Sequence, residues 1–343
     1  MRAIRIHPAP EGTPPYTPSN PAPTSALHLD NIQTPHPSAP GELLIKITST
    51  TIIRDTLTWP ETYTREYFTP GNDLSGTVVE IFSPDSKFKV GDEVFGMTGA
   101  ARCGTWAEYS LVLEDEIAKK PVRFSWEEAA ALPLSGMTAL EALVHASVSI
   151  PDDEDALPDV RGEYVDLDEK KKVLITGAGG AVGVYVVQFA RIAGLHVTAA
   201  TSSNERNAGF LRDLGADDTI EYPALTTAAR QEVYDIIIDT VGGQPLIDSW
   251  GCVKNNGFLI TVDSSSFNFV EEHTKLGVRK EGVKALFFIV EGGSKNLDVL
   301  AHFADLGVLR VFVLDNYPLE KTREAYERAN GRLTGRGKIM LLI

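Results

Sequence analysis

The amino-acid sequence predicts an α/β protein with a β-rich domain and a second domain built on a doubly wound parallel sheet. Its 343 residues exceed the about 150 residues typical of one domain. Short β-rich runs separated by Gly and Asp fill residues 42–113, a pattern typical of a barrel or sandwich. From residue 171 onward, predicted strands and helices alternate, the order that produces a parallel sheet covered by helices on both faces.

Composition and charge exclude several classes of partner. Hydrophobic residues make up 43% and charged residues 23% of the chain, which is typical of a globular protein. The 47 acidic residues outnumber the 32 basic ones and give a net charge of -15. Such a charge repels nucleic-acid phosphates and anionic membrane surfaces. We therefore expect neither nucleic acid nor membrane as a partner.

The cysteines and the first residues indicate the compartment. Cys103 and Cys252 are far apart, and no Cys-x-x-Cys occurs, which excludes a disulfide framework and a four-cysteine zinc site. Residues 1–10 lack the apolar run of a secretory signal. The uncharged run over residues 173–190 contains four glycines, so it predicts a strand, a turn and a helix rather than a membrane span. We expect a cytoplasmic protein.

The first domain opens with a proline-rich stretch. Half of the 20 prolines lie in residues 8–40, where the proline ring excludes helix interiors and sheet centres, so we expect a surface loop. The β-rich runs GELLIKITST, SGTVVEI, GDEVFG and TWAEYSLVL follow. Ser125 and Glu128 then form a capping box that opens a helix. A second helix is expected from about Ser135.

An acidic stretch follows this pair of helices. Residues 151–170 hold nine acidic and two basic side chains. Like charges in such a block repel one another and remain hydrated. We interpret it as a solvated linker, although a lid or a docking surface would have the same composition.

The second domain is predicted from strands VLIT, HVTAAT, DIIIDT, FLIT and ALFFIV and from helices over residues 181–193 and 205–214. A last helix over residues 319–330 and the strand KIMLLI are more amphipathic. They could return to the first domain.

A glycine-rich turn stands between the first strand of this domain and its first helix. Strand KKVLIT leads into the run Gly177, Ala178, Gly179, Gly180, Ala181, Val182 and Gly183. Glycines let the backbone turn tightly and approach a pyrophosphate, while the free N–H groups of the helix attract its negative charge. The order strand, glycine turn and apolar helix therefore predicts a dinucleotide site.

The end of the next strand indicates which dinucleotide is bound. NAD-binding proteins usually place an acid there for the ribose hydroxyls, but this chain has Thr201, Ser202 and Ser203, with Arg206 soon after. Small hydroxyls and an arginine suit a 2′-phosphate. Glu205 could bind a ribose hydroxyl instead, or could simply favour the helix dipole. We predict NADP(H) as the cofactor.

Segments across the chain resemble those of one superfamily. The matching stretches are GNDLSGTVVE, FKVGDEVFG, GTWAEYS, AALPLSGMTALEAL, VLITGAGGAVGVYVVQFAR, LRDLGADDTIEY, YDIIIDTVGG and GKIMLLI. Their order resembles the medium-chain dehydrogenase/reductase superfamily, in its zinc-independent branch of quinone-oxidoreductase-like proteins and enoyl reductases. The resemblance implies a GroES-like catalytic domain over residues 1–140, completed by about residues 308–343. It also implies a Rossmann NADP-binding domain over residues 141–307.

The resemblance further implies that no metal is bound. Zinc-dependent relatives carry a histidine where this chain has Asn72, and cysteines in the region of Arg54 and Asp55. Neither Cys103 nor Cys252 lies at such a position, so we interpret both as buried, unreactive thiols. The seven histidines show no metal-binding spacing.

Without a metal, hydride from NADPH suits an acceptor that is already electron-poor, such as a quinone or the β-carbon of an enone. Tyr63 and Thr138 are the candidate hydrogen-bond donors to the acceptor oxygen, because related reductases approach the nicotinamide near the second. Tyr63 could instead cover the cleft as a loop aromatic, and Thr138 could cap or bend its helix. Asp55 matches an acidic position common in the family, which we interpret as structural.

The resemblance implies further cofactor contacts, each of which could instead be a packing residue. They are Tyr222 beside the adenine, Thr240, Val241 and Gly242 after strand DIIIDT, Phe287 and Phe288 near the nicotinamide, and Lys338 in the closing GK.

The leading hypothesis is an NADPH-dependent reductase of a small-molecule quinone or α,β-unsaturated carbonyl. A trans-acting enoyl reductase of a polyketide pathway is the first alternative; the acidic insert weighs against it because carrier proteins are commonly acidic too. A non-catalytic NADPH-binding sensor or partner is the second. The chain could act as a homodimer.

Overall fold

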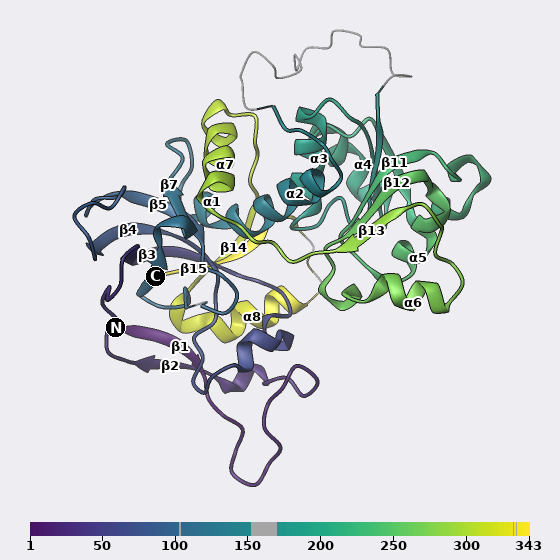
Figure 1. The fold of residues 1–343 in the computed structure, drawn as a ribbon. Helices are drawn as coiled ribbons and strands as arrows, with labels where there is room; N and C mark the ends of the chain where they lie inside the picture. Colours follow the sequence, from purple (N-terminus) through teal and green to yellow (C-terminus); the bar gives the residue numbers. More distant parts are fainter. Residues whose placement is uncertain (103, 152–169, 332, 334) are drawn as a thin grey trace. The chain divides into compact units, whose positions relative to one another are not determined.

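The computed structural model describes residues 1–102, 104–151, 170–331, 333 and 335–343. This part of the chain forms two compact units, Met1–Met137 with Glu291–Ile343 and Thr138–Val290 (Figure 1). The first unit is therefore discontinuous in sequence. Most of the acidic insert, residues 152–169, lies outside the described residues.

One boundary differs from the prediction. Helix α7 (Ser294–Leu306) was assigned to the second domain but belongs to the first unit. The backbone N–H and the hydroxyl of Ser294 both donate to Asp115, at 3.1 and 2.7 Å. Leu300 packs so closely on Gly136 that a Cβ added there would lie 3.0 Å from the leucine Cδ1. These contacts join α7 to the first unit. They link residues that are far apart in sequence, so no local pattern predicts them.

The first unit is built on a seven-stranded sheet. Its strands, in spatial order, are β14 (Val313–Pro318), β15 (Lys338–Leu342), β3 (Glu42–Ile52), β4 (Asp73–Ile81), β5 (Glu93–Met97) and β7 (Ile117–Lys119), with β6 (Tyr109–Leu113) paired to β3. All pairs are antiparallel except β14 with β15. The predicted β-rich domain is thereby confirmed, and the C-terminal strand does return to it.

The core of this sheet follows from the alternation of its strands. Leu43, Ile45 and Ile47 of β3 point to one side, because successive side chains of a strand face opposite ways, and they pack with Leu74 and Val78 of β4. Gly76 lets β3 and β4 approach, since a Cβ there would lie 2.2 Å from a backbone carbonyl oxygen of β3.

The proline-rich residues form irregular loops on both sides of a short strand that the sequence did not predict. Strand β2 (Leu27–Asn31) pairs antiparallel with β1 (Arg2–Ile6). Leu27 of β2 is buried, whereas the four residues after it are partly or fully exposed. The strand is only five residues long and has prolines on both sides, so its sequence pattern did not indicate a strand.

The helices of the first unit begin where the sequence indicates. In α1 (Trp126–Ala131) the predicted capping box is confirmed, since Glu128 N donates to Ser125 Oγ at 3.2 Å and Ser125 N donates to Glu128 Oε2 at 2.9 Å. Helix α2 (Pro133–His145) follows at once and contains the boundary between the two units, at Met137 and Thr138. Helix α8 (Thr322–Asn330) contacts β15.

The second unit is a six-stranded parallel sheet. Its order is β10 (Asp218–Glu221), β9 (His196–Thr201), β8 (Lys172–Ile175), β11 (Tyr234–Asp239), β12 (Val253–Thr261) and β13 (Lys284–Phe287). The strand order reverses between β8 and β11, which defines a doubly wound sheet with its ligand crevice at the carboxyl ends of these strands. The predicted doubly wound parallel sheet is confirmed, although β10 was not among the predicted strands.

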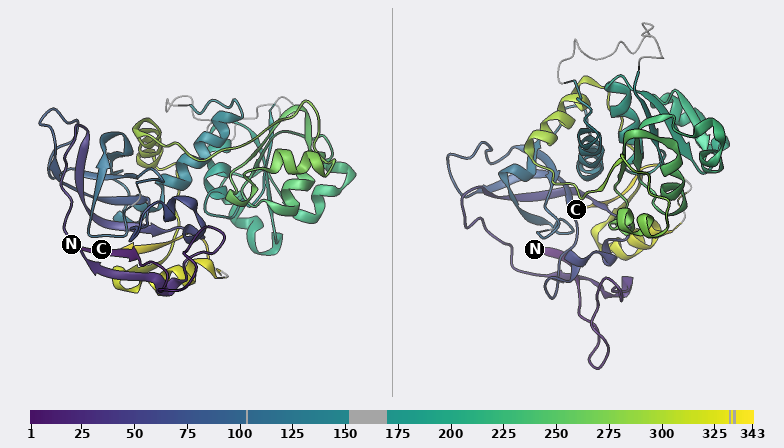
Figure 2. Two further views of the ribbon diagram at one scale, coloured as in Figure 1. Left: turned by 60° about the horizontal axis from the view of Figure 1, so that its bottom comes forward. Right: turned by 45° about the vertical axis from the view of Figure 1, so that its right-hand side comes forward.

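Helices cover both faces of this sheet (Figure 1; two further views in Figure 2). Helices α3 (Gly183–Ile192) and α4 (Asn204–Asp213) follow β8 and β9, whereas α5 (Gly243–Cys252) and α6 (Phe269–Lys275) follow β11 and β12. The central strands are buried on both sides, as Leu174 and Ile237 show with 0% exposure, and therefore carry unbroken apolar runs. No helix of the described residues is long and apolar enough to cross a membrane.

Candidate nucleotide-binding and catalytic site

The glycine turn after β8 is shaped by two glycines and open at a third. Gly177 has φ +64°, and a Cβ there would lie 2.3 Å from Thr240 Oγ1. At Gly183, the first residue of α3, a Cβ would lie 2.2 Å from the Gly177 carbonyl oxygen. Gly179 has nothing within 4 Å of an added Cβ. The turn thus presents exposed backbone at Gly180 and Ala181, just before the helix, and this fits the pyrophosphate of a dinucleotide.

Asp239 holds the carboxyl ends of three strands together beneath this turn. Its carboxylate accepts from the Thr176 hydroxyl after β8, from the Thr261 hydroxyl of β12 at 2.7 Å and from Gly242 N at 2.9 Å. Burial raises the pKa of Asp239 above its ordinary value, and the donated hydrogen bonds oppose that rise. The sequence reasoning did not single out Asp239. It stands last in a buried strand, which is the position that could have drawn attention to it.

Tyr222 and Thr240 contact the glycine turn directly. The Tyr222 hydroxyl accepts from Gly177 N at 3.2 Å, and burial raises the pKa of this tyrosine. The Thr240 hydroxyl donates to the Thr176 carbonyl at 2.9 Å. Val241 beside it is 41% exposed. The structure therefore brings these residues of the predicted nucleotide site to one edge of the sheet.

The residues predicted to bind a 2′-phosphate lie at the carboxyl end of β9. Ser203 is the N-cap of α4, and its side chain makes no capping bond among the described residues. Ser202 and Arg206 are exposed. Asn204 N donates instead to the Glu221 carboxylate at 2.8 Å. Sequence reasoning missed Glu221, because only the pairing of β10 with β9 brings it to this place.

The two phenylalanines predicted near the nicotinamide have separate surroundings. Phe287, the last residue of β13, packs against the core of the second unit. The Phe288 ring lies 4.6 Å from the His145 ring, centre to centre. Thr138 is buried, at 7% exposure, in α2.

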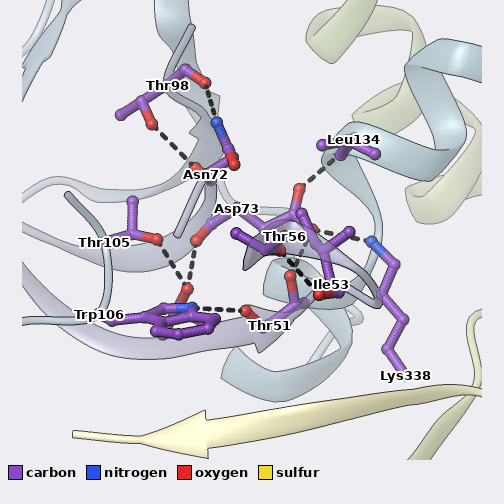
Figure 3. Close-up of polar contacts among 11 residues, drawn as sticks. Thr51, Ile53, Thr56, Asn72, Asp73, Thr98, Thr105, Trp106, Leu134 and Lys338 are labelled. Atoms are coloured by element: carbon purple, nitrogen blue, oxygen red, sulfur yellow. Dashed lines mark hydrogen bonds and ion pairs between the residues drawn. The ribbon is translucent and has the colours of Figure 1, made fainter. Parts of the chain in front are cut away.

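Lys338 forms a buried ion pair that the sequence did not predict. Its ammonium group lies 2.8 Å from Asp73 Oδ2, and the two residues are 8% and 0% exposed (Figure 3). The same carboxylate accepts from the Thr51 hydroxyl at 2.7 Å and from Leu134 N at 2.7 Å. This ion pair joins β15 to β4, and the predicted contact of Lys338 with the cofactor stays a prediction.

Asn72, the residue at which the resemblance implies the loss of a zinc-binding histidine, is hydrogen-bonded to Thr98 in two places. Its amide nitrogen donates to the Thr98 carbonyl at 3.1 Å, and Thr98 N donates to the Asn72 carbonyl at 3.0 Å (Figure 3). Arg54, in the region of the missing cysteines, forms an ion pair with Asp55 at 3.3 Å. Among the described residues there is no group of three or more His, Cys, Asp and Glu that could hold a metal ion.

Of the two cysteines, the structure describes Cys252. Cys252 is buried, its thiol donates to the Leu225 carbonyl at 3.1 Å, and burial raises its pKa to about 11. A thiol with such a pKa is a weak nucleophile at neutral pH. Cys103 lies outside the described residues.

Tyr63 has both hydrogen bonds of its hydroxyl satisfied inside the first unit. The hydroxyl donates to the Leu57 carbonyl and accepts from Ala22 N at 2.8 Å, and burial raises its pKa. Its ring packs against the core and lines a cavity of about 200 Å³ with Pro8, Tyr16 and other residues. This arrangement favours the alternative in which Tyr63 is a packing residue.

One unit is β-rich, and the other is a doubly wound sheet with a glycine turn at its crevice. Together they define an oxidoreductase of the dinucleotide-binding class. Comparisons with known proteins agree. Residues 39–122 match the alcohol dehydrogenase GroES-like domain, and residues 214–341 match the zinc-binding dehydrogenase family. A probable zinc-binding oxidoreductase, mitochondrial, of Arthroderma benhamiae is 35% identical over 329 residues, 94% of each chain.

Two further comparisons define the branch. A chloroplast envelope quinone oxidoreductase homolog of Arabidopsis thaliana is 28% identical and covers 91% of this chain and 93% of its own. The structure of the quinone oxidoreductase from Coxiella burnetii matches with a TM-score of 0.78 and 25% identity over 100% of this chain and 99% of that chain. The chain belongs to the medium-chain dehydrogenase/reductase superfamily, in its quinone-oxidoreductase-like branch. It is an oxidoreductase, and membership of this family implies a nicotinamide cofactor.

Proposed function

We propose that this protein is an NADPH-dependent reductase that delivers hydride to a small-molecule quinone or α,β-unsaturated carbonyl without a metal. The observation that supports the proposal most is the glycine turn of the second unit. Its backbone is open at Gly179, and it lies on the same sheet edge as the end of β9, where Ser202, Ser203 and Arg206 follow one another.

The residues of this edge have distinct proposed roles. Backbone N–H groups of Gly179, Ala181, Val182 and Gly183 would hold the pyrophosphate, because helix N-termini attract anions. Gly180 N donates to the Gly177 carbonyl at 2.8 Å and would hold the turn in shape. The loop of Thr240, Val241 and Gly242 would flank it, and Asp239 fixes that loop from below.

On the adenosine side, Ser202 and Ser203 would donate to a 2′-phosphate and Arg206 would supply charge. Tyr222 would support the turn and the adenine. Thr138, Phe287 and Phe288 are proposed for the nicotinamide side. When bound, the nicotinamide supplies the hydride.

The choice of acceptor follows from the donor set in the first unit. The amide of Asn72 is hydrogen-bonded to Thr98, and Arg54 is ion-paired with Asp55. Neither Asn72 nor Arg54 is a side chain that zinc takes as a ligand. We therefore propose activation by hydrogen bonds alone. Such activation suffices for an electron-poor quinone or enone but not for an unactivated ketone. Thr138 remains the proposed donor, because the proton of the Tyr63 hydroxyl is bonded to Leu57.

The test is a panel of acceptors followed at the absorbance of NADPH. Quinones and activated enals should be reduced, and saturated ketones of similar size, which form the matched control, should be nearly inert. Faster turnover of an enoyl thioester on a carrier protein would favour the polyketide alternative. Binding of NADPH with no turnover of any acceptor would favour the sensor. Oxidation of a simple alcohol faster than reduction of every enone would contradict the proposal.

A further inference from the structure

The structure supplies an acid at a place where the sequence shows none. Glu221 ends β10, and its Cα is paired in register with Thr201, the last residue of β9. Its carboxylate accepts from Asn204 N, the first residue of α4, at 2.8 Å. The neighbouring strand thus places a negative charge next to Ser203.

That place has a defined meaning in dinucleotide-binding sheets. An acid at the end of the second strand accepts hydrogen bonds from the ribose hydroxyls of NAD(H), whereas NADP(H) carries a phosphate there. In this chain β9 is the second strand and ends in hydroxyl residues, and the acid comes from the third strand, β10. The hydroxyl residues at the end of β9 therefore favour NADP(H), whereas the acid at the end of β10 favours NAD(H).

We propose that Glu221 is a specificity-determining residue that lowers the affinity for NADPH and allows NADH to bind. This inference rests on the proposed function, because it concerns the adenosine end of the proposed cofactor site. Ser202, Ser203 and Arg206 attract a 2′-phosphate, and the carboxylate of Glu221 repels it. With NADH, the same carboxylate accepts a hydrogen bond from a ribose hydroxyl. The wild-type protein uses both cofactors and prefers NADPH only modestly.

The test is Glu221→Gln, which removes the charge and keeps an oxygen that can accept from Asn204 N. Dissociation constants for NADPH and NADH are measured by titration of the full chain. Loss of the repulsion should tighten NADPH binding by on the order of tenfold. NADH binding should change by about threefold or less, because the amide oxygen still accepts a hydrogen bond. The ratio of the two constants is the readout, since a merely structural role would move both together.

Two further variants serve as controls. Glu221→Asp keeps the charge and should keep the wild-type ratio to within about threefold. Asp213→Asn removes one negative charge at the last residue of α4, roughly 14 Å from its first residue. Because that separation exceeds the screening length at physiological salt, this variant should leave both constants unchanged.

Each outcome has one meaning. The inference is supported if Glu221→Gln raises the ratio of the dissociation constant for NADH to that for NADPH, and if this rise is smaller at high salt. An unchanged ratio, or equal shifts for the two cofactors, overturns it while the proposed function stands. A wild-type protein that binds neither cofactor overturns the proposed function and this inference with it.

Discussion

Lys338 and Asp73, 265 positions apart in the chain, form a buried ion pair of 2.8 Å. The pair connects β15, the last strand, to β4. Each charge is out of water, so each depends on the other for compensation.

Removal of one partner should therefore be costly. Lys338→Met leaves the carboxylate of Asp73 buried with its backbone and hydroxyl donors alone, and we expect a loss of about 3–5 kcal/mol in the free energy of unfolding, measured in denaturant. The matched control is Lys321→Met, which breaks the exposed pair with Glu324 and should cost less than about 1 kcal/mol. Equal, small losses would show that the buried pair is not required. The double variant Asp73→Leu with Lys338→Met should recover part of the loss.

Tyr63→Phe tests whether the tyrosine is catalytic. Because its hydroxyl bridges Leu57 and Ala22, the variant should lose about 1–2 kcal/mol of stability. We expect kcat for quinone reduction to change by less than about threefold. A fall in kcat of about a hundredfold or more, the size found when an oxyanion donor is lost, would show that Tyr63 acts in catalysis.

Arg206→Ala tests the proposed 2′-phosphate contact. A hydrogen bond to a charged group is worth about 1.5–3 kcal/mol, so NADPH binding should weaken roughly 10- to 150-fold. NADH binding should barely change, because NADH lacks the phosphate. Titration of both cofactors against both proteins measures this. Equal effects on the two cofactors would identify Arg206 as an exposed helix residue without a role in the site.

Metal content tests the zinc-free proposal. Since Asn72 and Arg54 offer no anionic ligand, elemental analysis should find substoichiometric zinc, and incubation with a chelator should leave activity unchanged. The names of the matched family and of one relative refer to zinc, which makes this measurement decisive. Stoichiometric zinc that leaves together with activity would contradict the proposal.

The parts that the sequence predicted are those encoded by adjacent residues. The capping box of Ser125 and Glu128 needs only the next turn of chain, and the glycine turn needs only the strand before it and the helix after it. Both formed as expected. Apolar runs likewise predicted five of the six parallel strands, but not β10, whose sequence is DTIE.

The parts that sequence reasoning missed depend on which strands become neighbours. Nothing near Lys338 indicates Asp73, and nothing near Thr201 indicates Glu221, because both pairings arise only when the sheets assemble. Helix α7 was misassigned for the same reason, since its partners Asp115 and Gly136 are far away in sequence. Local patterns define elements, and the contacts between distant elements decide what a charged side chain does.

The discontinuous first unit has a consequence for biosynthesis. Its sheet needs β14 and β15, which the ribosome makes last, and β15 pairs with β3, which it makes early. Until then β6 covers this edge of β3 only over residues 42–46, so residues 49–52 have no strand partner on that side. Asp73 likewise lacks the positive charge of Lys338. The second unit is one continuous segment, Thr138–Val290, and can fold as soon as it emerges. We expect the middle of this protein to fold before its beginning, so that a nascent chain stopped before Lys338 carries a finished nucleotide-binding unit and an incomplete partner.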